Sequence, residues 1–271
     1  MTELITAKLL LIACFLLIVT LVETLAYSTR IAGTRVRLIA TAISLFSTLV
    51  IVSRFSTMIQ QPMTAKLINA APEGNVMKFI EEQYRLLIGV TSIGVLLGML
   101  LFPTFILIFS KAIVQMSEQR GSIPALVKKN MNLRGIKRML SCIRIPRFYY
   151  LKGITLQTIP KRLFCLNVIV TAVFTTGVLS SIYASIIAPE YAQAALMSSG
   201  IINGVATIIL TLFIDPKASV LADRVVTNPS KYIYLKSYSL TMVSSKFVGT
   251  LAAQIIFLPA AYYVAWFARW I

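Results

Sequence analysis

Two charged residues, Glu23 and Arg54, fall where the sequence predicts membrane-spanning helices, and they are the first candidates for chemistry. The uncharged runs before them, residues 9–22 and 38–53, are shorter than the roughly 20 residues that a helix needs to cross the hydrocarbon core. Each helix must therefore continue past its charged residue. A charge at membrane depth is costly and commonly faces a cavity or a partner. The alternative is a side chain that extends outwards to the interface.

Glu23, Asp215 and Lys246 fall near the same end of their expected helices, and Arg30 and Arg35 follow the first of these helices closely. Charged residues inside membrane proteins usually pair with one another. We expect Glu23 and Asp215 to hold Lys246, or the Arg30 and Arg35 pair, in one polar cluster. The alternative for Asp215 is ordinary turn chemistry, because a proline follows it.

Arg54 lies towards the opposite membrane surface, where we expect it to line the outer part of a cavity. Asn203 and Gln254 lie in the middle of expected spans, where an amide side chain needs a hydrogen-bonding partner. Guanidinium groups pair bidentately with phosphate, so arginines at membrane depth indicate an anionic ligand. We therefore expect a substrate-binding site for an anion that combines these three residues with the polar cluster.

The residues that metal and acid–base chemistry require are scarce. No histidine occurs in the sequence, which excludes metalloproteases of the HExxH type and hydrolases with a histidine base. Asp215 and Asp223 flank a proline and do not form a convincing magnesium site. Cys14, Cys142 and Cys165 have no paired spacing, so disulfides and zinc are not expected. With no Walker motif either, the sequence favours a transporter without cofactor or metal over an enzyme.

The composition indicates a membrane protein whose elements are long helices. Hydrophobic residues make up 58% of the 271-residue chain and charged residues 13%, which is more apolar than a soluble domain of this length needs. Residues 60–84 are expected to form an external connection with a short helix. The predicted fold is all-α, with membrane spans at residues 9–27, 38–59, 86–110, 164–188, 191–214 and 247–268.

A basic segment, residues 111–162, separates two hydrophobic halves and indicates the orientation of the chain. It holds twelve Lys and Arg residues against one acid, and such a segment stays on the cytoplasmic side. We expect a first three-helix half at residues 1–110, a second at residues 163–271, and both termini outside the cell membrane. The net charge of +17 then indicates contacts with anionic lipids rather than nucleic acid.

Three weaker patterns complete the prediction. Residues 133–143 place apolar and basic side chains on opposite sides of a helix, which indicates an amphipathic helix on the inner leaflet, or else a basic loop that serves only topology. The GxxxG motifs at residues 94–98 and 200–204 predict close helix packing. A shift of 156 residues aligns Pro103 with Pro259, two residues expected to kink their helices, and each span of the first half with one of the second. This alignment predicts two inverted repeats, with a chance match as the alternative.

Residues 23–35, ETLAYSTRIAGTR, resemble the first-helix signature of the Amj family of bacterial lipid II flippases. The resemblance covers nearly the whole chain, through short segments in the same order. These are VSR at 52–54, IQQP at 59–62, FPT at 102–104, GSIP at 121–124, VLSSIYA at 178–184, GIING at 200–204, DP at 215–216 and PAAY at 259–262.

The resemblance implies a transporter of lipid II, the undecaprenyl-pyrophosphate-linked disaccharide-pentapeptide from which peptidoglycan is made. Such a protein moves lipid II from the inner to the outer leaflet as an alternative to the MurJ type of flippase. If the substrate is the one that the resemblance implies, we expect from the positions of the arginines that Arg30 and Arg35 capture the pyrophosphate and that Arg54 receives it near the outer side. Two alternatives stay open: a transporter of another anionic lipid or solute, and a membrane scaffold that recruits cell-envelope machinery.

Overall fold

The computed structural model describes residues 5–72, 74–119, 121, 141–144, 154 and 159–270. This part of the chain contains helices and short connections but no strand. Six of its helical segments are long and apolar enough to cross a membrane. The predicted all-α fold with six spans is therefore confirmed, and the chain is a multi-pass membrane protein.

The first half of the chain forms three spans, of which the first consists of two consecutive helices. Its elements are α1 (Ala7–Ala26), α2 (Ser28–Val36), α3 (Ile39–Ala65), the 3-10 turn η1 (Ile68–Ala70) and α4 (Val76–Glu118). The hydroxyl of Thr6 caps α1 by accepting a hydrogen bond from the Leu9 backbone N–H at 3.2 Å. Helix α2 continues the direction of the chain until Arg37, whose φ of 57° is left-handed and ends the helix.

The second half also forms three spans, and its middle span contains a π-helical turn. Its elements are α7 (Lys161–Ile187), η3 (Pro189–Tyr191), α8 (Ala192–Ile209), the π-helical η4 (Leu210–Ile214), α9 (Asp215–Thr227), η5 (Pro229–Lys231) and α10 (Tyr232–Phe267). Pro216 is tolerated because it lies in the first turn of α9, where a missing backbone N–H costs little. Asp215 therefore begins a helix that continues α8, instead of ending a span in a turn.

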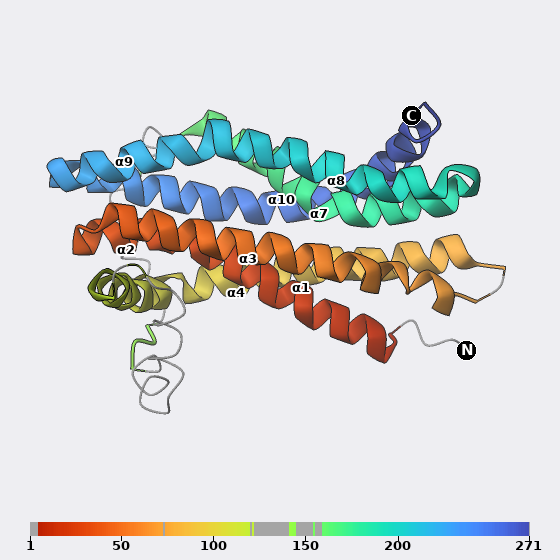
Figure 1. Cartoon of the computed structure of the whole chain (residues 1–271), viewed down its shortest axis with the longest axis horizontal. Coiled ribbons are helices and arrows are strands. Elements are labelled where there is room, and N and C mark those ends of the chain that lie inside the picture. The colour runs from red at the N-terminus through yellow and green to blue at the C-terminus, as the bar shows by residue number, and fades with distance from the viewer. Residues whose placement is uncertain are drawn as a thin grey trace.

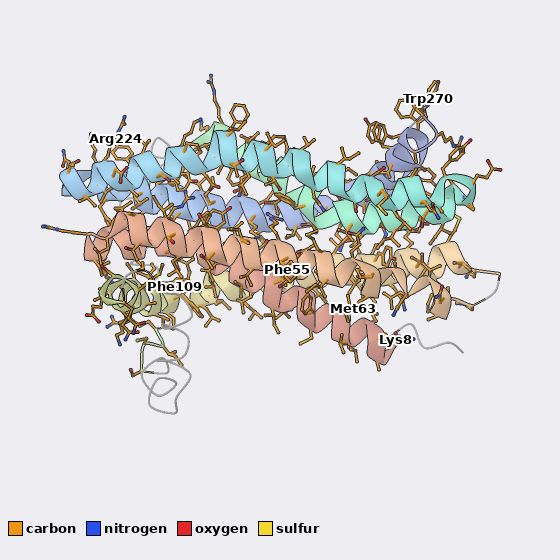
Figure 2. The ribbon with its side chains drawn as sticks, viewed as in Figure 1. Lys8, Phe55, Met63, Phe109, Arg224 and Trp270 are labelled. Carbon is orange, nitrogen blue, oxygen red and sulfur yellow. The ribbon has the colours of Figure 1, made fainter. Side chains whose placement is uncertain are left out.

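The two halves form two layers that lie along each other (Figure 1). Helices α1–α4 make one layer and α7–α10 the other, and both ends of the chain lie at the same end of the bundle. Lys8 and Trp270 lie at that end, whereas Arg224 lies at the opposite one (Figure 2). The last part of α10, which contains Pro259, turns away from the rest of the bundle.

Two connections between the predicted spans are helical, although the sequence analysis assigned no helix to them. Residues 28–36 form α2, and the region after residue 214 forms α9 and the first turns of α10. In α2, the hydroxyls of Ser28, Thr29 and Thr34 donate to backbone carbonyls three residues earlier, at 2.7–2.9 Å. These side chains are polar, but their hydroxyls find hydrogen-bond acceptors in the carbonyls of the preceding turn. They can therefore be buried. The external connection is likewise much shorter than residues 60–84, because α3 and α4 extend into it.

The two GxxxG motifs behave differently in the structure. A side-chain carbon at Gly94 or Gly98 would collide with Thr20 or Thr24 of α1, so this motif allows the close packing of α1 on α4 that we predicted. At residues 200–204, by contrast, a side-chain carbon on either glycine would meet nothing within 4 Å. The second motif therefore does not serve helix packing, and the prediction for it is wrong.

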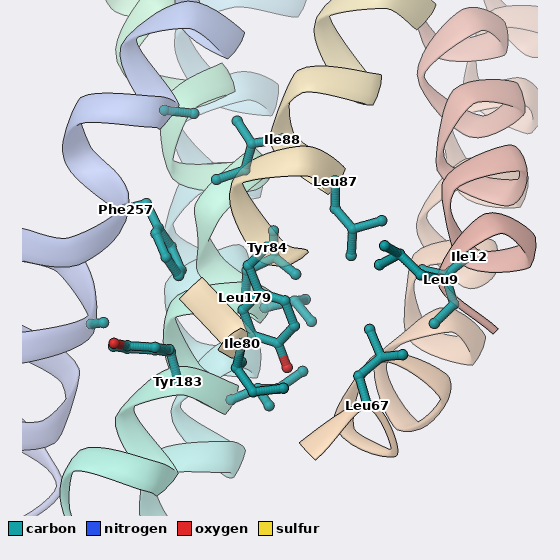
Figure 3. Packing of buried hydrophobic residues seen from close by; sticks show 14 of the residues in the cluster. Leu9, Ile12, Leu67, Ile80, Tyr84, Leu87, Ile88, Leu179, Tyr183 and Phe257 are labelled. Atoms are coloured by element: carbon teal, nitrogen blue, oxygen red, sulfur yellow. The ribbon is translucent and has the colours of Figure 1, made fainter. Parts of the chain in front are cut away.

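An apolar core joins the two layers along α4, α7 and α10 (Figure 3). Tyr84 of α4 packs edge-on against Phe257 of α10, with ring centroids 6.2 Å apart, and Tyr183 of α7 packs against the same ring at 5.5 Å. All three rings are buried. Aromatic pairs of this geometry add about 0.5–1.5 kcal/mol each beyond the area that they bury. This side of the interface between the layers is therefore tightly packed.

Most of the basic segment, including residues 133–140 of the predicted amphipathic helix, lies outside the described residues. Within the described part, Arg144 exchanges two hydrogen bonds with the Thr104 hydroxyl of α4, at 2.9 and 3.1 Å. Lys111 lies 3.1 Å from the sulfur of Cys142. The division into two halves with a basic segment between them, and the inverted repeat, stay predictions.

Candidate functional site

A cavity of about 400 Å³ lies between the two layers, at the level where α1, α3, α7, α8 and α10 approach one another. Its lining is mixed: apolar side chains alternate with hydroxyls, amides and charges. The polar and charged lining residues are Thr20, Glu23, Tyr27, Arg54, Thr57, Gln60, Gln61, Thr91, Asn167, Thr171, Thr175, Ser199, Asn203, Thr207, Lys246 and Thr250. A concave site of this size with a few convergent polar groups is typical of a ligand-binding site.

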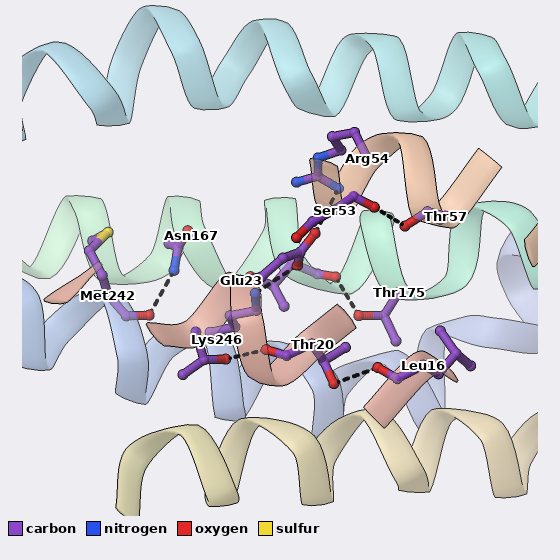
Figure 4. A network of polar contacts seen from close by, with 12 residues as sticks. Leu16, Thr20, Glu23, Ser53, Arg54, Thr57, Asn167, Thr175, Met242 and Lys246 are labelled. Atoms are coloured by element: carbon purple, nitrogen blue, oxygen red, sulfur yellow. Dashed lines mark hydrogen bonds and ion pairs between the residues drawn. The ribbon is translucent and has the colours of Figure 1, made fainter. Parts of the chain in front are cut away.

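Three charged side chains from three helices meet in this cavity (Figure 4). The Lys246 ammonium of α10 donates to Oε2 of Glu23 on α1 at 2.8 Å. Nη1 of Arg54 on α3 lies 3.7 Å from Oε1 of the same carboxylate. The side chains of Lys246, Glu23 and Arg54 are 9%, 15% and 29% exposed. Two cations thus share one carboxylate, and the cluster has a formal charge of +1.

Arg54 retains unused capacity to bind an anion. Its guanidinium carbon lies 3.4 Å from the centroid of the Phe174 ring on α7, so the aromatic face holds the planar group in place. Its Nε–H is buried and finds no hydrogen-bond partner among the described residues. Buried donors without a partner are uncommon and call for an explanation. A bound anion that accepts from this guanidinium would supply one.

A second ion pair lies away from the cavity and joins α2 to α9. Nη2 of Arg30 lies 2.7 Å from Oδ1 of Asp215, and the Arg30 guanidinium carbon lies 4.2 Å from the centroid of the Phe46 ring. The Arg30 side chain is 3% exposed and that of Asp215 24% exposed. The pairing of Glu23 with Lys246 and of Asp215 with Arg30 agrees with the predicted partners. They form two separate pairs, however, and not one cluster, while Arg35 lies exposed in the last turn of α2.

Arg54 lies within the same charged group as Glu23 and not in a separate outer part of the cavity, so the predicted separation is wrong. The reason is the length of the helical segments. The first span runs from Ala7 to Val36, which places Glu23 near its middle. Helix α3 likewise extends to Ala65 and α10 begins at Tyr232, so Arg54 and Lys246 also fall well inside their helices.

The two amides that we predicted at mid-membrane depth have different surroundings. Asn203 lines the cavity, and its Oδ1 atom is buried without a hydrogen-bond partner in the described part of the chain. Gln254 lies outside the cavity lining and ties α10 to α4: its Nε2 donates to the Arg85 carbonyl, and Nη1 of Arg85 donates to the Gln254 carbonyl, both at 2.9 Å. Arg85 also pairs with Glu81 on its own helix at 2.8 Å.

Several lining residues were missed by the sequence reasoning. Asn167 of α7 donates to the Met242 carbonyl at 3.0 Å and to the Ser245 hydroxyl at 2.8 Å, next to the charged group. The rule that selected Asn203, an amide within an expected span, would also have found Asn167. Gln61 is different, because it lies at the end of α3 in a stretch that we took for an external connection. Its Nε2 donates to the Ser199 hydroxyl of α8 at 2.8 Å.

These features define a class of protein: a multi-pass helical membrane protein whose two three-span layers enclose a cationic cavity, the arrangement on which transporters are built. No group of residues in the described part of the chain is suited to hold a metal ion.

The chain belongs to the Amj family, since the family model described as "Alternate to MurJ" matches residues 15–268. The lipid II flippase Amj of Bacillus subtilis (strain 168) is 48% identical over 266 residues, which cover 98% of each chain. No solved structure matches this chain. The predicted resemblance to the Amj family is therefore confirmed.

Proposed function

We propose that this protein is a lipid II flippase, which moves the lipid-linked peptidoglycan precursor from the inner to the outer leaflet of the cell membrane. The observation that carries the proposal is the cationic group of Arg54, Lys246 and Glu23 in a cavity between the two layers. The 48% identity to a lipid II flippase over nearly the whole chain supports the same function. Both lines of argument indicate transport and not catalysis.

The pyrophosphate of lipid II suits this charged group. A pyrophosphate diester carries two negative charges, and the cavity offers two cations that are partly neutralised by Glu23. When the pyrophosphate binds, its oxygens take the place of the Glu23 carboxylate beside Arg54 and Lys246. This exchange gives both cations a new anionic partner. It leaves the Glu23 carboxylate to be paired or protonated elsewhere, because an unpaired charge is costly at this depth. Glu23 therefore keeps the empty site stable and competes with the substrate.

The size of the cavity requires a change of conformation. Its volume of about 400 Å³ lies low in the range of roughly 300–1,000 Å³ that is typical for drug-sized ligands. A disaccharide with a pentapeptide and pyrophosphate is larger than such a ligand. The two layers must therefore move apart to admit the whole head group, and the structure has the features of a closed state. Rocking of one layer on the other would expose the cavity to each side in turn.

The inner side of the membrane is assigned by charge. Arg224 lies at the end of the bundle opposite both termini, and so does α2, whose last turn contains Arg35 (Figures 1 and 2). Basic residues at this end support a topology with both termini outside. Exposed cations at this end would attract anionic lipids and the pyrophosphate of lipid II from the inner leaflet. Arg35 is free to make the first contact, whereas Arg30 becomes available only if its pair with Asp215 opens.

The test is reconstitution of the purified protein in vesicles with fluorescent lipid II, followed by a quencher that cannot cross the bilayer. We expect rapid exchange of lipid II between leaflets. Arg54→Ala should slow it roughly tenfold or more, because a hydrogen bond to a charged group contributes about 1.5–3 kcal/mol. Arg54→Lys should restore it only in part, since lysine cannot bind bidentately. Lys78→Ala removes an exposed cation far from the cavity and is the matched control.

Three outcomes would contradict the proposal. Wild-type protein that leaves lipid II in its original leaflet would exclude the flippase function. If the protein moved another polyprenyl-pyrophosphate lipid between leaflets but not lipid II, the proposed anion-binding site would stand, but the proposed substrate would be wrong. Envelope function in cells that survives Arg54→Ala but is lost with residues 133–143 would favour the scaffold.

A further inference from the structure

The two layers are joined unequally along their two long sides. On one side, α4, α7 and α10 share a continuous apolar core, anchored by Tyr84, Tyr183 and Phe257. On the other side, α3 and α8 run along each other with little direct contact, although both line the same cavity. Thr57, Met58 and Gln61 contribute from α3, and Ser199, Gly200, Asn203, Gly204 and Thr207 contribute from α8.

The boundary between α3 and α8 forms a seam. On the α8 side, only small side chains face it. Gly200 and Gly204 are exposed, and a side-chain carbon on either would meet nothing within 4 Å. Between them, Asn203 carries a buried carbonyl oxygen without a partner in the described part of the chain. A polar cavity wall thus lies directly behind an unfilled gap between two helices.

The outer rim of the seam is strongly apolar. Met58 on α3 is 69% exposed and Met197 on α8 is 78% exposed, and both lie where the membrane hydrocarbon is expected. A path therefore leads sideways from lipid, between α3 and α8, to the cations Arg54 and Lys246. This order of surfaces, apolar outside and cationic inside, is complementary to a lipid whose anionic head carries a long apolar chain.

Each end of the seam is closed by a small number of polar contacts. At one end, Nε2 of Gln61 donates to the Ser199 hydroxyl at 2.8 Å and lies 3.4 Å from the Leu196 carbonyl. At the other end, the Arg30–Asp215 pair joins α2 to α9. Side-chain hydrogen bonds between membrane helices contribute only about 0.6 kcal/mol on average. The Gln61 contact can therefore break easily, whereas the aromatic core on the opposite side holds the layers together.

We propose that the seam between α3 and α8 is a lateral portal, through which the polyprenyl chain of the substrate stays in the bilayer while its pyrophosphate occupies the cavity. The contact from Gln61 to Ser199 is the latch of this portal, and the α4–α7–α10 core is the hinge. The inference rests on the proposed function and adds the path of the apolar chain. The glycines of α8 leave room for that chain to slide from one leaflet to the other.

The test is a reversible tether across the seam. Gln61→Cys and Ser199→Cys are introduced together, with Cys14, Cys142 and Cys165 replaced by serine, and joined by a short bifunctional methanethiosulfonate reagent. The control tether joins Arg85→Cys to Gln254→Cys on the hinge side, where the two residues already exchange hydrogen bonds. Lipid II exchange is measured in vesicles before tethering, after tethering and after reduction.

We expect the α3–α8 tether to lower exchange at least tenfold, reduction to restore it, and the control tether to leave it unchanged. Full exchange with the α3–α8 tether in place would overturn the portal, as would equal loss with both tethers. Absence of exchange in the reduced, untethered wild-type protein would instead reject the flippase function itself. With Ser199→Cys alone, a tethered product of twice the mass would place a second copy at the seam and also reject the portal.

Discussion

Removal of the charges of Glu23 and Lys246, singly and together, measures directly whether the charged group is a coupled unit. Glu23→Gln leaves two cations without a carboxylate, and Lys246→Met leaves Glu23 with only the more distant Arg54. Removing one partner of a buried pair costs about 3–5 kcal/mol. We expect the lower end, about 3 kcal/mol, because the three side chains are 9–29% exposed and not fully buried.

The double variant should be less destabilised than the sum of the two single variants. Only Arg54 is then left without a carboxylate, and it remains stacked on Phe174. A coupling free energy of about 1–3 kcal/mol is expected for residues in one charged group. The readout is the midpoint of thermal unfolding in detergent, followed as the fraction of protein that stays monodisperse. A loss of 3 kcal/mol corresponds to a shift of roughly 6–12 °C for a chain of this size.

The Glu81–Arg85 pair supplies the matched control. It also joins a glutamate to a basic residue at 2.8 Å, but its side chains are 26% and 38% exposed and lie on one helix. The cycle of Glu81→Gln and Arg85→Met should give a coupling of only about 0.3–0.5 kcal/mol. A coupling at Glu23–Lys246 no larger than this value would refute the reasoning, because the two residues would then behave as independent, solvated charges.

Three further predictions follow from single contacts. Asp215→Asn leaves the 3%-exposed Arg30 without its carboxylate partner and should lower the unfolding midpoint. The double variant Arg30→Asp with Asp215→Arg should recover part of this loss, and no recovery would count against the pair. Gly94→Val should lower the unfolding midpoint, because the valine side chain would collide with α1, whereas Gly200→Val should leave the midpoint unchanged. Equal midpoints for the two variants would contradict the difference between the two glycine motifs. Gly200→Trp should fold yet slow lipid II exchange by filling the α3–α8 seam. Val205→Trp, on the side of α8 that faces away from the cavity and is 53% exposed, should exchange at the wild-type rate, and similar rates for the two variants would argue against a portal there.

The sequence was sufficient to predict the class of fold and the set of charged residues that pair inside the helices, but not which acid pairs with which base. Hydrophobic runs that are too short without Glu23 and Arg54 placed both residues inside helices, and the structure brings both to one site. The depth of these residues was misjudged because the ends of the helices are polar. The hydroxyls of α2 bond to its own backbone, so its sequence looks like a loop although the segment is buried helix.

The seam between α3 and α8 could not be predicted from the sequence. The GxxxG motif at residues 200–204 is identical in form to the one at residues 94–98, but only the latter is packed against another helix. Motifs of small residues indicate which helix surfaces could pack closely. Which of these surfaces actually pack depends on the arrangement of all the helices. The role of Gln61 was hidden for a related reason, because its partner Ser199 is 138 residues away in the chain.

The composition of the charged group limits how the protein can work. Two cations without Glu23 would be costly at this depth when the cavity is empty, and they would hold a divalent anion too tightly to release it. One carboxylate shared by Lys246 and Arg54 lowers both costs, since the two cations have an anionic partner in the empty and in the occupied site. The displaced carboxylate also opposes binding that is too tight. The free-energy difference between the two states is then smaller than it would be for two cations alone. A lipid whose apolar chain stays in the bilayer adds little to that difference, because the chain is never transferred to water. Small differences between states are what a flippase needs in order to bind on one side and release on the other.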